Sequence, residues 1–218
     1  MVDFDRARAI MVENQLRTGG VLDNRILARM KTVPREAYLP EAQRTLAYVD
    51  SVQWLGDRGR GRFMPPPATL GKLLQLAEIG GHESVLMVGS NTGYSVAVVA
   101  GLADRVVGLE ADAALARFSQ EALAAQGISN AEIVNGQIEA LGRRQFDVII
   151  VEGTLDSVPQ SLTDRLAEGG RLIALIRSAG VPVATVFVRT GSTVAARQEF
   201  NATLPPLFPA QGEPAFVF

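Results

Sequence analysis

Residues 84–95 read Ser-Val-Leu-Met-Val-Gly-Ser-Asn-Thr-Gly-Tyr-Ser, and the rest of the chain is organised around this stretch. The apolar run at 85–88 predicts a buried strand, and the apolar residues 96–102 predict a helix after it. The glycines and the asparagine between them tolerate the left-handed backbone of a tight turn. Such a unit is expected to present free backbone N–H groups and the positive end of a helix dipole at the carboxyl end of a strand, where open α/β sheets bind ligands.

Strands and helices alternate after this unit. Strands are predicted at 105–110, 131–134, 146–151 and 171–176, and helices at 112–126 and 159–167. Apolar strands separated by helices are typical of a parallel sheet that is covered on both faces. Residues 181–189 and 193–200 then predict an antiparallel hairpin, and 204–209, with three prolines, an extended tail. The fold class is therefore α/β.

The N-terminal third predicts helices instead, at about 5–17 and 23–31, with a short helical turn at 41–48. A further helix is expected at 68–79, ended by Gly80-Gly81. We expect residues 1–67 to form a helical cap with a loop, and residues 68–218 to form the core. The two regions are expected to pack as one compact unit.

Residues 50–67 combine arginines with glycines, prolines and two aromatic side chains. One interpretation is a site for an anion or a single-stranded nucleic acid, because Arg58, Arg60 and Arg62 lie between Trp54 and Phe63. The other is a loop that leads into the next helix. The sequence favours the loop, since one short basic segment in an acidic protein is weak evidence for a binding site.

Composition excludes several kinds of chemistry. The 218 residues contain no cysteine and a single histidine, His82, so disulfides, thiolate nucleophiles and Cys-based or His-rich metal sites are not expected. The net charge of −2 does not favour a dedicated nucleic-acid binder. No apolar stretch is long enough to predict a membrane span or a signal peptide, so a cytoplasmic protein is expected.

A nucleotide site is indicated by Glu110, which ends the second predicted strand about 20 positions after Gly89. A carboxylate at a strand end accepts hydrogen bonds from ribose hydroxyls. The turn has neither G-x-G-x-x-G nor a Walker motif. This pattern, with the closing hairpin, favours an S-adenosylmethionine methyltransferase over a dehydrogenase. The alternative is that the glycines only make a tight corner.

Six segments of the chain resemble the protein-L-isoaspartate O-methyltransferase family and keep its order. They are residues 11–17, 33–40, 47–50, 85–94, 146–151 and 169–172. The three N-terminal segments, Met-Val-Glu-Asn-Gln-Leu-Arg, Val-Pro-Arg-Glu-Ala-Tyr-Leu-Pro and Ala-Tyr-Val-Asp, are the specific ones, because general methyltransferases lack them. The resemblance implies a seven-stranded, mostly parallel, doubly wound sheet with S-adenosylmethionine at the 89–94 turn. It also implies methyl transfer to the α-carboxylate of L-isoaspartyl residues in damaged protein, a repair reaction.

The same resemblance implies which residues form the site. Those expected at the cofactor are Gly89, Ser90, Asn91, Gly93, Tyr94, Glu110, Ala111, Gln137, Ile138 and Glu152. Arg60 and Arg62 are candidates for binding the substrate carboxylate, because they lie where the family's substrate loop lies. No metal is expected, and the implied partner is a protein or peptide with isoaspartyl residues.

The chain also departs from the family pattern. Phe63 and Pro65 stand where the family has Thr and Ser, Met87 replaces an acidic residue, and Gln137 follows Gly136 where the family has Asp. Glu152 replaces a small neutral residue after the fourth strand. Two alternatives therefore remain open: a methyltransferase of the same lineage with another substrate, and a catalytically inactive cofactor-binding or interaction protein.

Overall fold

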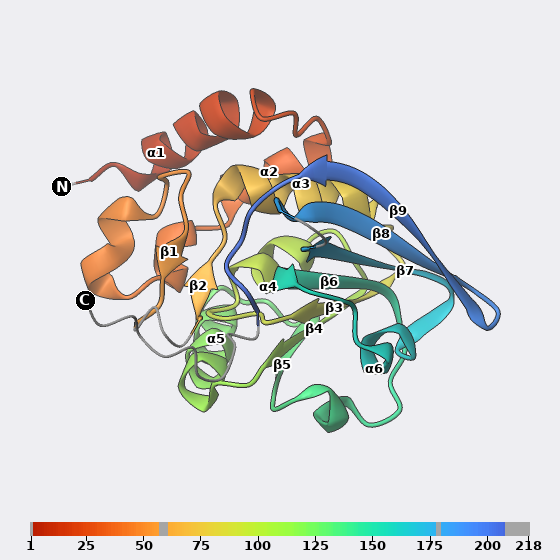
Figure 1. The fold of residues 1–218 in the computed structure, drawn as a ribbon. Coiled ribbons are helices and arrows are strands. Elements are labelled where there is room, and N and C mark those ends of the chain that lie inside the picture. Colours follow the sequence, from red (N-terminus) through yellow and green to blue (C-terminus); the bar gives the residue numbers. More distant parts are fainter. Residues whose placement is uncertain (1, 57–60, 178–179, 208–218) are drawn as a thin grey trace, which may run out of the picture.

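A seven-stranded sheet forms the centre of the molecule, in the order β5-β4-β3-β6-β7-β8-β9 (Figure 1). The computed structural model describes residues 2–56, 61–177 and 180–207. Five strands run parallel: β3 (Ser84–Val88), β4 (Arg105–Glu110), β5 (Ala131–Asn135), β6 (Phe146–Leu155) and β7 (Leu166–Ile176). The hairpin β8 (Val183–Thr190) and β9 (Thr193–Asn201) is antiparallel. This sheet confirms the predicted fold class.

The two faces of the sheet are covered unequally. The helices α3 (Pro67–Ala77), α4 (Tyr94–Val99) and α5 (Ala113–Ala125) belong to the larger hydrophobic cluster, on one face. Among the described residues, the other face is covered by the short α6 (Gln160–Thr163), the 3₁₀-helix η5 (Ile138–Leu141) and loop residues such as Leu207. The prediction of a helix over 159–167 was therefore too long. Leu166 is fully buried and pairs with Phe146 as the start of β7, and this burial outweighs helix propensity.

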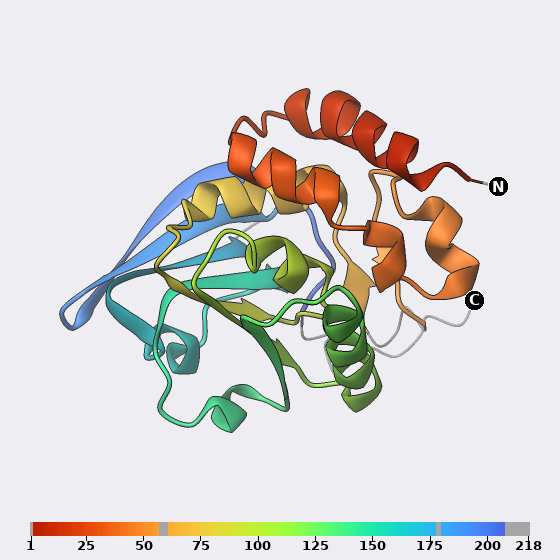
Figure 2. The same ribbon diagram turned by 180° about the vertical axis from the view of Figure 1, so that it is seen from behind.

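The N-terminal residues form a cap of helices that lies over α3, as both ribbon views show (Figures 1 and 2). α1 (Phe4–Met11) continues as a π-helix, η1 (Val12–Arg17), and is followed by α2 (Asn24–Thr32) and the 3₁₀-helices η2 (Arg35–Tyr38) and η3 (Glu41–Leu46). The predicted helices are confirmed, although the π-helical turn has no signal in the sequence. Met11, Leu16 and Met30 share one hydrophobic cluster with Val85 and Met87 of β3.

Two short strands were missed within the predicted loop. β1 (Gln53–Trp54) pairs antiparallel with β2 (Phe63–Met64), and the Trp54 and Phe63 rings pack edge to face with their centroids 5.9 Å apart. Residues 57–60 between them, with Arg58 and Arg60, lie outside the described part of the chain.

The end of α3 also differs from the prediction. Glu78, in the left-handed conformation with φ +49°, ends this helix before Gly80-Gly81 is reached. Arg171 of β7 donates hydrogen bonds to the carbonyls of Ala77 and Glu78. The free carbonyl groups at the end of α3 are therefore paired by a side chain that is distant in sequence. An expectation based on glycines next to the helix does not predict such a partner.

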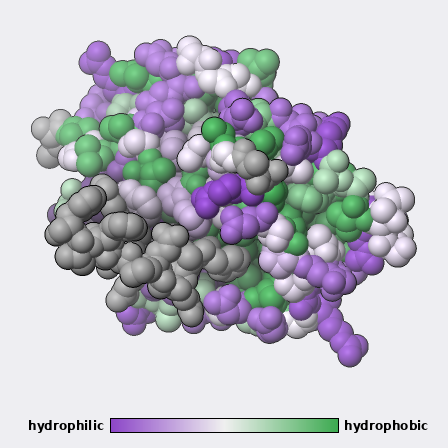
Figure 3. All heavy atoms as spheres, in the orientation of Figure 1, coloured by the Kyte–Doolittle hydropathy of each residue, from purple (hydrophilic) through white to green (hydrophobic). Residues whose placement is uncertain are grey.

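The outer surface on the face of Figure 1 mixes hydrophilic and hydrophobic residues (Figure 3). Among the helices of the described residues, none combines the length and the apolar character that crossing a membrane requires.

Candidate active site

The turn after β3 has the left-handed backbone that its sequence predicts. Gly89, Asn91 and Gly93 have φ angles of +75°, +51° and +87°. A Cβ at Gly93 would lie 2.1 Å from the Ser119 hydroxyl oxygen, so only glycine fits there. The backbone amides differ from the expectation, because those of Gly89 and Ser90 donate to the Leu109 carbonyl and that of Gly93 donates to Ser90. These amides are therefore not free for a ligand.

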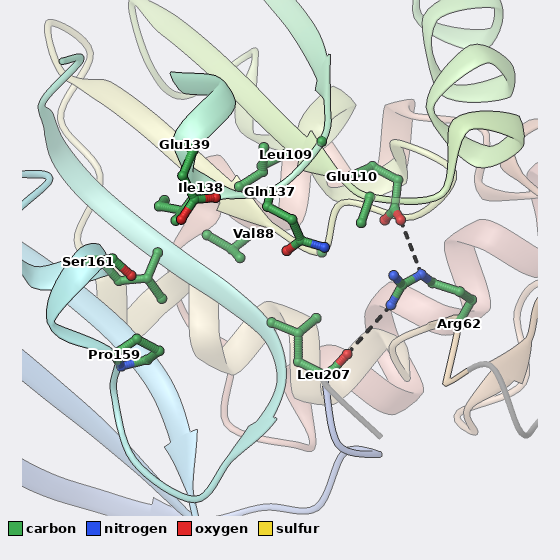
Figure 4. Close-up of a pocket in the computed structure, with 14 residues that line it drawn as sticks. Arg62, Val88, Leu109, Glu110, Gln137, Ile138, Glu139, Pro159, Ser161 and Leu207 are labelled. Carbon is green, nitrogen blue, oxygen red and sulfur yellow. Dashed lines mark hydrogen bonds and ion pairs between the residues drawn. The ribbon is translucent and has the colours of Figure 1, made fainter. Parts of the chain in front are cut away.

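A cavity of about 220 Å³ opens beside this turn, at the carboxyl ends of β3 and β4. Its walls are mostly apolar, and the side chains of Gln137, just before η5, and Arg62, just before β2, extend into it with polar groups (Figure 4). Lining residues are Arg62, Val88, Gly89, Leu109, Glu110, Ala111, Gly136, Gln137, Ile138, Glu139, Pro159, Ser161, Leu162 and Leu207. Apolar walls with a few oriented polar groups are typical of small-molecule sites.

Glu110 lies fully buried at the end of β4, and its carboxylate is held in a fixed position by backbone amides. Oε2 accepts from the Asn91 amide at 2.9 Å, and Oε1 accepts from the Asp112 amide at 2.8 Å. These bonds leave about one further acceptor site on each oxygen, since a carboxylate offers about four in all. Two free sites on one carboxylate match the two adjacent hydroxyls of a ribose.

Arg62 takes one of those two sites. Its Nε lies 3.1 Å from Glu110 Oε1, and its side chain is 18% exposed. Nη1 also donates to the Leu207 carbonyl at 3.5 Å, so the guanidinium lies between β4 and the C-terminal tail (Figure 4). A ligand that needs both oxygens of Glu110 must therefore displace Arg62 from Oε1.

The tail at 204–207 closes the cavity on its other side. Thr154 of β6 donates through its amide to Pro205 and through its hydroxyl to Leu204, and its carbonyl accepts from the Leu207 amide. These bonds press the Leu207 side chain against the turn, so that a Cβ at Gly89 would lie 2.3 Å from Leu207 Cδ1. Leu207 therefore occupies the space that a side chain at position 89 would need.

Glu152 of β6 is buried near the same turn and does not line the cavity. The Ser95 hydroxyl donates a very short hydrogen bond to its carboxylate. Burial raises the pKa of Glu152 to about 8, and the nearby negative charge of Glu110 acts in the same direction. The side chain is 2% exposed, and among the described residues no cationic group forms an ion pair with it.

Tyr94, at the start of α4, links the sheet to the cap rather than lining the cavity. Its ring packs against Tyr38 with a centroid distance of 5.8 Å, and the Arg35 guanidinium carbon lies 4.8 Å from its centroid. Burial raises the pKa of Tyr94 and lowers that of Arg35. Arg35 Nε donates to the Ala47 carbonyl at 2.7 Å, which ties the cap together beneath the site.

The predicted site residues fall into two groups. Gly89, Glu110, Ala111, Gln137, Ile138 and Arg62 line the cavity. Ser90, Asn91, Gly93, Tyr94 and Glu152 are buried next to it, and Arg60 lies outside the described residues. The other lining residues were not predicted as site residues: Val88, Leu109, Gly136, Glu139, Pro159, Ser161, Leu162 and Leu207. Val88, Leu109, Gly136 and Glu139 are direct neighbours of predicted site residues, which is the signal that could have identified them.

The cavity fits a nucleoside. Apolar walls from Val88, Leu109 and Ile138 suit a base, the Gln137 amide can both donate and accept, and Glu110 can accept from ribose. A ligand that is longer than a nucleoside and extends past Gly89 requires Leu207 to move. Within the described residues, no group of three or more His, Asp or Glu side chains is arranged to hold a metal ion.

The sheet order and the cavity beside β3 and β4 are those expected of an S-adenosylmethionine-dependent methyltransferase. Residues 6–207 match the model of the protein-L-isoaspartate(D-aspartate) O-methyltransferase (PCMT) family. The chain belongs to this family.

Named relatives agree with this assignment. Protein-L-isoaspartate O-methyltransferase 1 of Syntrophobacter fumaroxidans is 35% identical over 79% of this chain and 80% of its own length. The protein of the same name from Rhodopseudomonas palustris is 38% identical over 78% of this chain and 69% of its own length. The fold is similar to that of a β-aspartate methyltransferase (PCMT) from Plasmodium falciparum, which was solved in complex with S-adenosyl-L-homocysteine. The match has a TM-score of 0.75 and 24% identity, and it covers 93% of this chain and 98% of the other.

Proposed function

We propose that the protein transfers a methyl group from S-adenosylmethionine to the α-carboxylate of L-isoaspartyl residues, as a protein-repair enzyme. The match of residues 6–207 to the isoaspartyl methyltransferase family is the observation that carries the proposal. The cavity supports it independently, because its walls, carboxylate and amide suit the nucleoside part of the cofactor.

In this proposal Glu110 binds the ribose hydroxyls and Gln137 binds the edge of the adenine. Arg62 leaves Glu110 Oε1 when the ribose takes that position, and its guanidinium becomes available at the cavity rim. A free guanidinium binds a carboxylate through two parallel hydrogen bonds. We therefore propose that Arg62, with Arg60, holds the isoaspartyl carboxylate of the substrate.

The reaction needs little proton chemistry from the protein. The cofactor supplies an electrophilic methyl group on a sulfonium. The isoaspartyl carboxylate is already ionised near neutral pH, so no general base has to activate it. The work of the chain is to bind both partners in line and to exclude water, and proximity supplies the rate. The carboxylate oxygen gains the methyl group as an ester, and the sulfur keeps the electron pair of the broken bond.

A methyltransferase of the same lineage with a different acceptor is the second candidate. It is favoured by the segment at 61–67, which carries no hydroxyl group. Phe63 is 1% exposed and donates its amide to Asn91, and the Pro65 carbonyl accepts from buried Arg35. Both residues have packing roles, and neither presents a group that orients a carboxylate.

An assay with a synthetic isoaspartyl peptide tests the main proposal. We expect methyl ester formation from labelled S-adenosylmethionine, followed by release of labelled methanol, and no signal with the matched aspartyl peptide. Calorimetry with S-adenosylhomocysteine runs in parallel. Binding without turnover on any isoaspartyl peptide would favour the second candidate, and no binding would remove the methyltransferase proposal altogether.

A cytoplasmic location, and the absence of a nucleic-acid or membrane partner, belong to the same proposal. The net charge of −2 supports the absence of a nucleic-acid partner.

A further inference from the structure

Glu152 is a buried acidic group that the nucleoside site does not use. Met87 and Ile150 are paired in the sheet register, and both lie in the larger hydrophobic cluster. Ser95 of α4, a helix that packs on this face, donates to the Glu152 carboxylate, so the Glu152 side chain lies on the same face as Met87. This position is the carboxyl edge of the sheet, level with Gly89.

The contacts of Glu152 leave its charge uncompensated. Ser95 of α4 donates to Oε1, and the ion pairs of the described residues do not include Glu152. The charged groups that act on it are Glu110 at the end of β4 and Arg35 of η2. Burying an ionised carboxylate without a cation costs desolvation free energy. Such a group is therefore either protonated or paired with a cationic ligand when one binds.

The route from the nucleoside cavity to Glu152 passes Gly89. The Glu152 carbonyl lies 3.7 Å from the position that a Cβ on Gly89 would take, and Leu207 fills the remaining space. A Cβ on Gly153 would also lie 2.8 Å from Leu207 Cβ. A ligand chain that leaves the cavity over Gly89 and moves Leu207 aside therefore arrives at the end of β6.

We propose that Glu152 is the binding group for the α-ammonium of the amino-acid part of the cofactor. This inference rests on the proposed function and deepens it. Glu110 and Gln137 bind the nucleoside, whereas Glu152 recognises a primary ammonium at the other end of the same ligand. Ser95 is a positioning residue, because its hydroxyl fixes Oε1 and leaves Oε2 to face the ligand.

If Glu152 binds the ammonium, its replacement should affect two ligands with the same nucleoside differently. S-adenosylhomocysteine carries the ammonium, whereas 5′-methylthioadenosine lacks the whole amino acid. We expect Glu152→Gln, which keeps the size of the side chain and an acceptor for Ser95, to weaken S-adenosylhomocysteine binding by about 10- to 100-fold. Its affinity for 5′-methylthioadenosine should stay within about twofold of wild type. Glu132→Gln, the same chemical change at a half-exposed surface pair, is the matched control and should alter neither affinity.

Proton release gives a second readout that a purely structural role would not produce. Because the pKa of Glu152 is raised to about 8, the free protein holds a proton there at pH 7. An ammonium binds the ionised form, so S-adenosylhomocysteine should release close to one proton. Calorimetry in buffers of different ionisation enthalpy measures this number. We expect no release with 5′-methylthioadenosine, and none with Glu152→Gln.

The outcomes keep the inference and the proposed function apart. If the wild-type protein binds neither ligand, the proposed cofactor is wrong. If it binds both, and Glu152→Gln changes the two affinities equally or not at all, the ammonium assignment is wrong while the cofactor stands. If Glu152→Gln fails to fold, the wild-type proton release decides alone, and its absence would overturn the assignment.

Discussion

At the scale of single residues, Arg62 gives the site its most distinctive feature. Its guanidinium pairs with Glu110, the carboxylate that is proposed to bind ribose, and also contacts the Leu207 carbonyl. The same side chain therefore competes with the nucleoside in one arrangement and is proposed to hold the substrate carboxylate in another. The two roles predict opposite effects when the side chain is removed.

We expect Arg62→Ala to tighten 5′-methylthioadenosine binding by about 3- to 10-fold, since Glu110 Oε1 no longer has to release a guanidinium. The KM for an isoaspartyl peptide should rise in the same variant. Calorimetry measures the affinity, and methanol release gives the KM. Arg144→Ala, which breaks an exposed ion pair with Glu132, serves as the control. Weaker nucleoside binding in Arg62→Ala would contradict the competition.

The nucleoside part of the site could be predicted from the sequence because it depends on local sequence patterns. Gly89 and Glu110 are close in sequence to the strand ends that fix them, so a turn pattern and a strand boundary identify both. Arg62 was proposed as a substrate ligand, and its contact with Glu110 depends on a hairpin, β1–β2, that has no local signal. The role of Leu207 could not be predicted either, because its position is fixed by a hydrogen bond from its amide to the carbonyl of Thr154, which is distant in sequence.

At the scale of elements, the tail at 204–207 is the part of the fold that shapes the cavity. The pairing of β3 with β6 ends at Val88 and Val151, so the edge of β6 beyond Val151 is free on that side, and Thr154 there pairs with Pro206 of the tail. The sequence predicts an extended tail, since prolines favour that geometry. Which strand the tail pairs with depends on β6 extending beyond the end of β3, and the relative lengths of two paired strands are not set by local sequence.

Leu207→Ala tests the role of this element. Leu207 is 4% exposed within the smaller hydrophobic cluster, so the truncation should lower the free energy of unfolding by about 2–4 kcal/mol. Space opened at Gly89 should at the same time tighten S-adenosylhomocysteine binding more than 5′-methylthioadenosine binding. Chemical denaturation and calorimetry measure the two effects. Leu155→Ala, equally buried in the same cluster, should lose stability without any gain in affinity.

At the scale of the whole molecule, the helical cap and the sheet are joined by polar as well as apolar contacts. Arg35 of the cap contacts the Tyr94 ring of α4 and donates to the Pro65 carbonyl, which precedes α3. The hydrophobic cluster continues from Met11 and Met30 through Tyr38 to Val85. Separating cap from sheet would expose this cluster on both sides, and would leave a buried guanidinium without its partners.

The cap and the sheet should therefore unfold in one transition. Trp54, the only tryptophan, lies in the β1–β2 hairpin of the cap region and reports on it by fluorescence, whereas far-UV circular dichroism follows the sheet and its helices. In urea the two signals should have the same midpoint, as expected for a two-state domain. Arg35→Lys should lower both midpoints together, because it removes the planar hydrogen-bonding geometry from the shared interface. A fluorescence change that precedes the loss of circular dichroism would show that the cap opens alone.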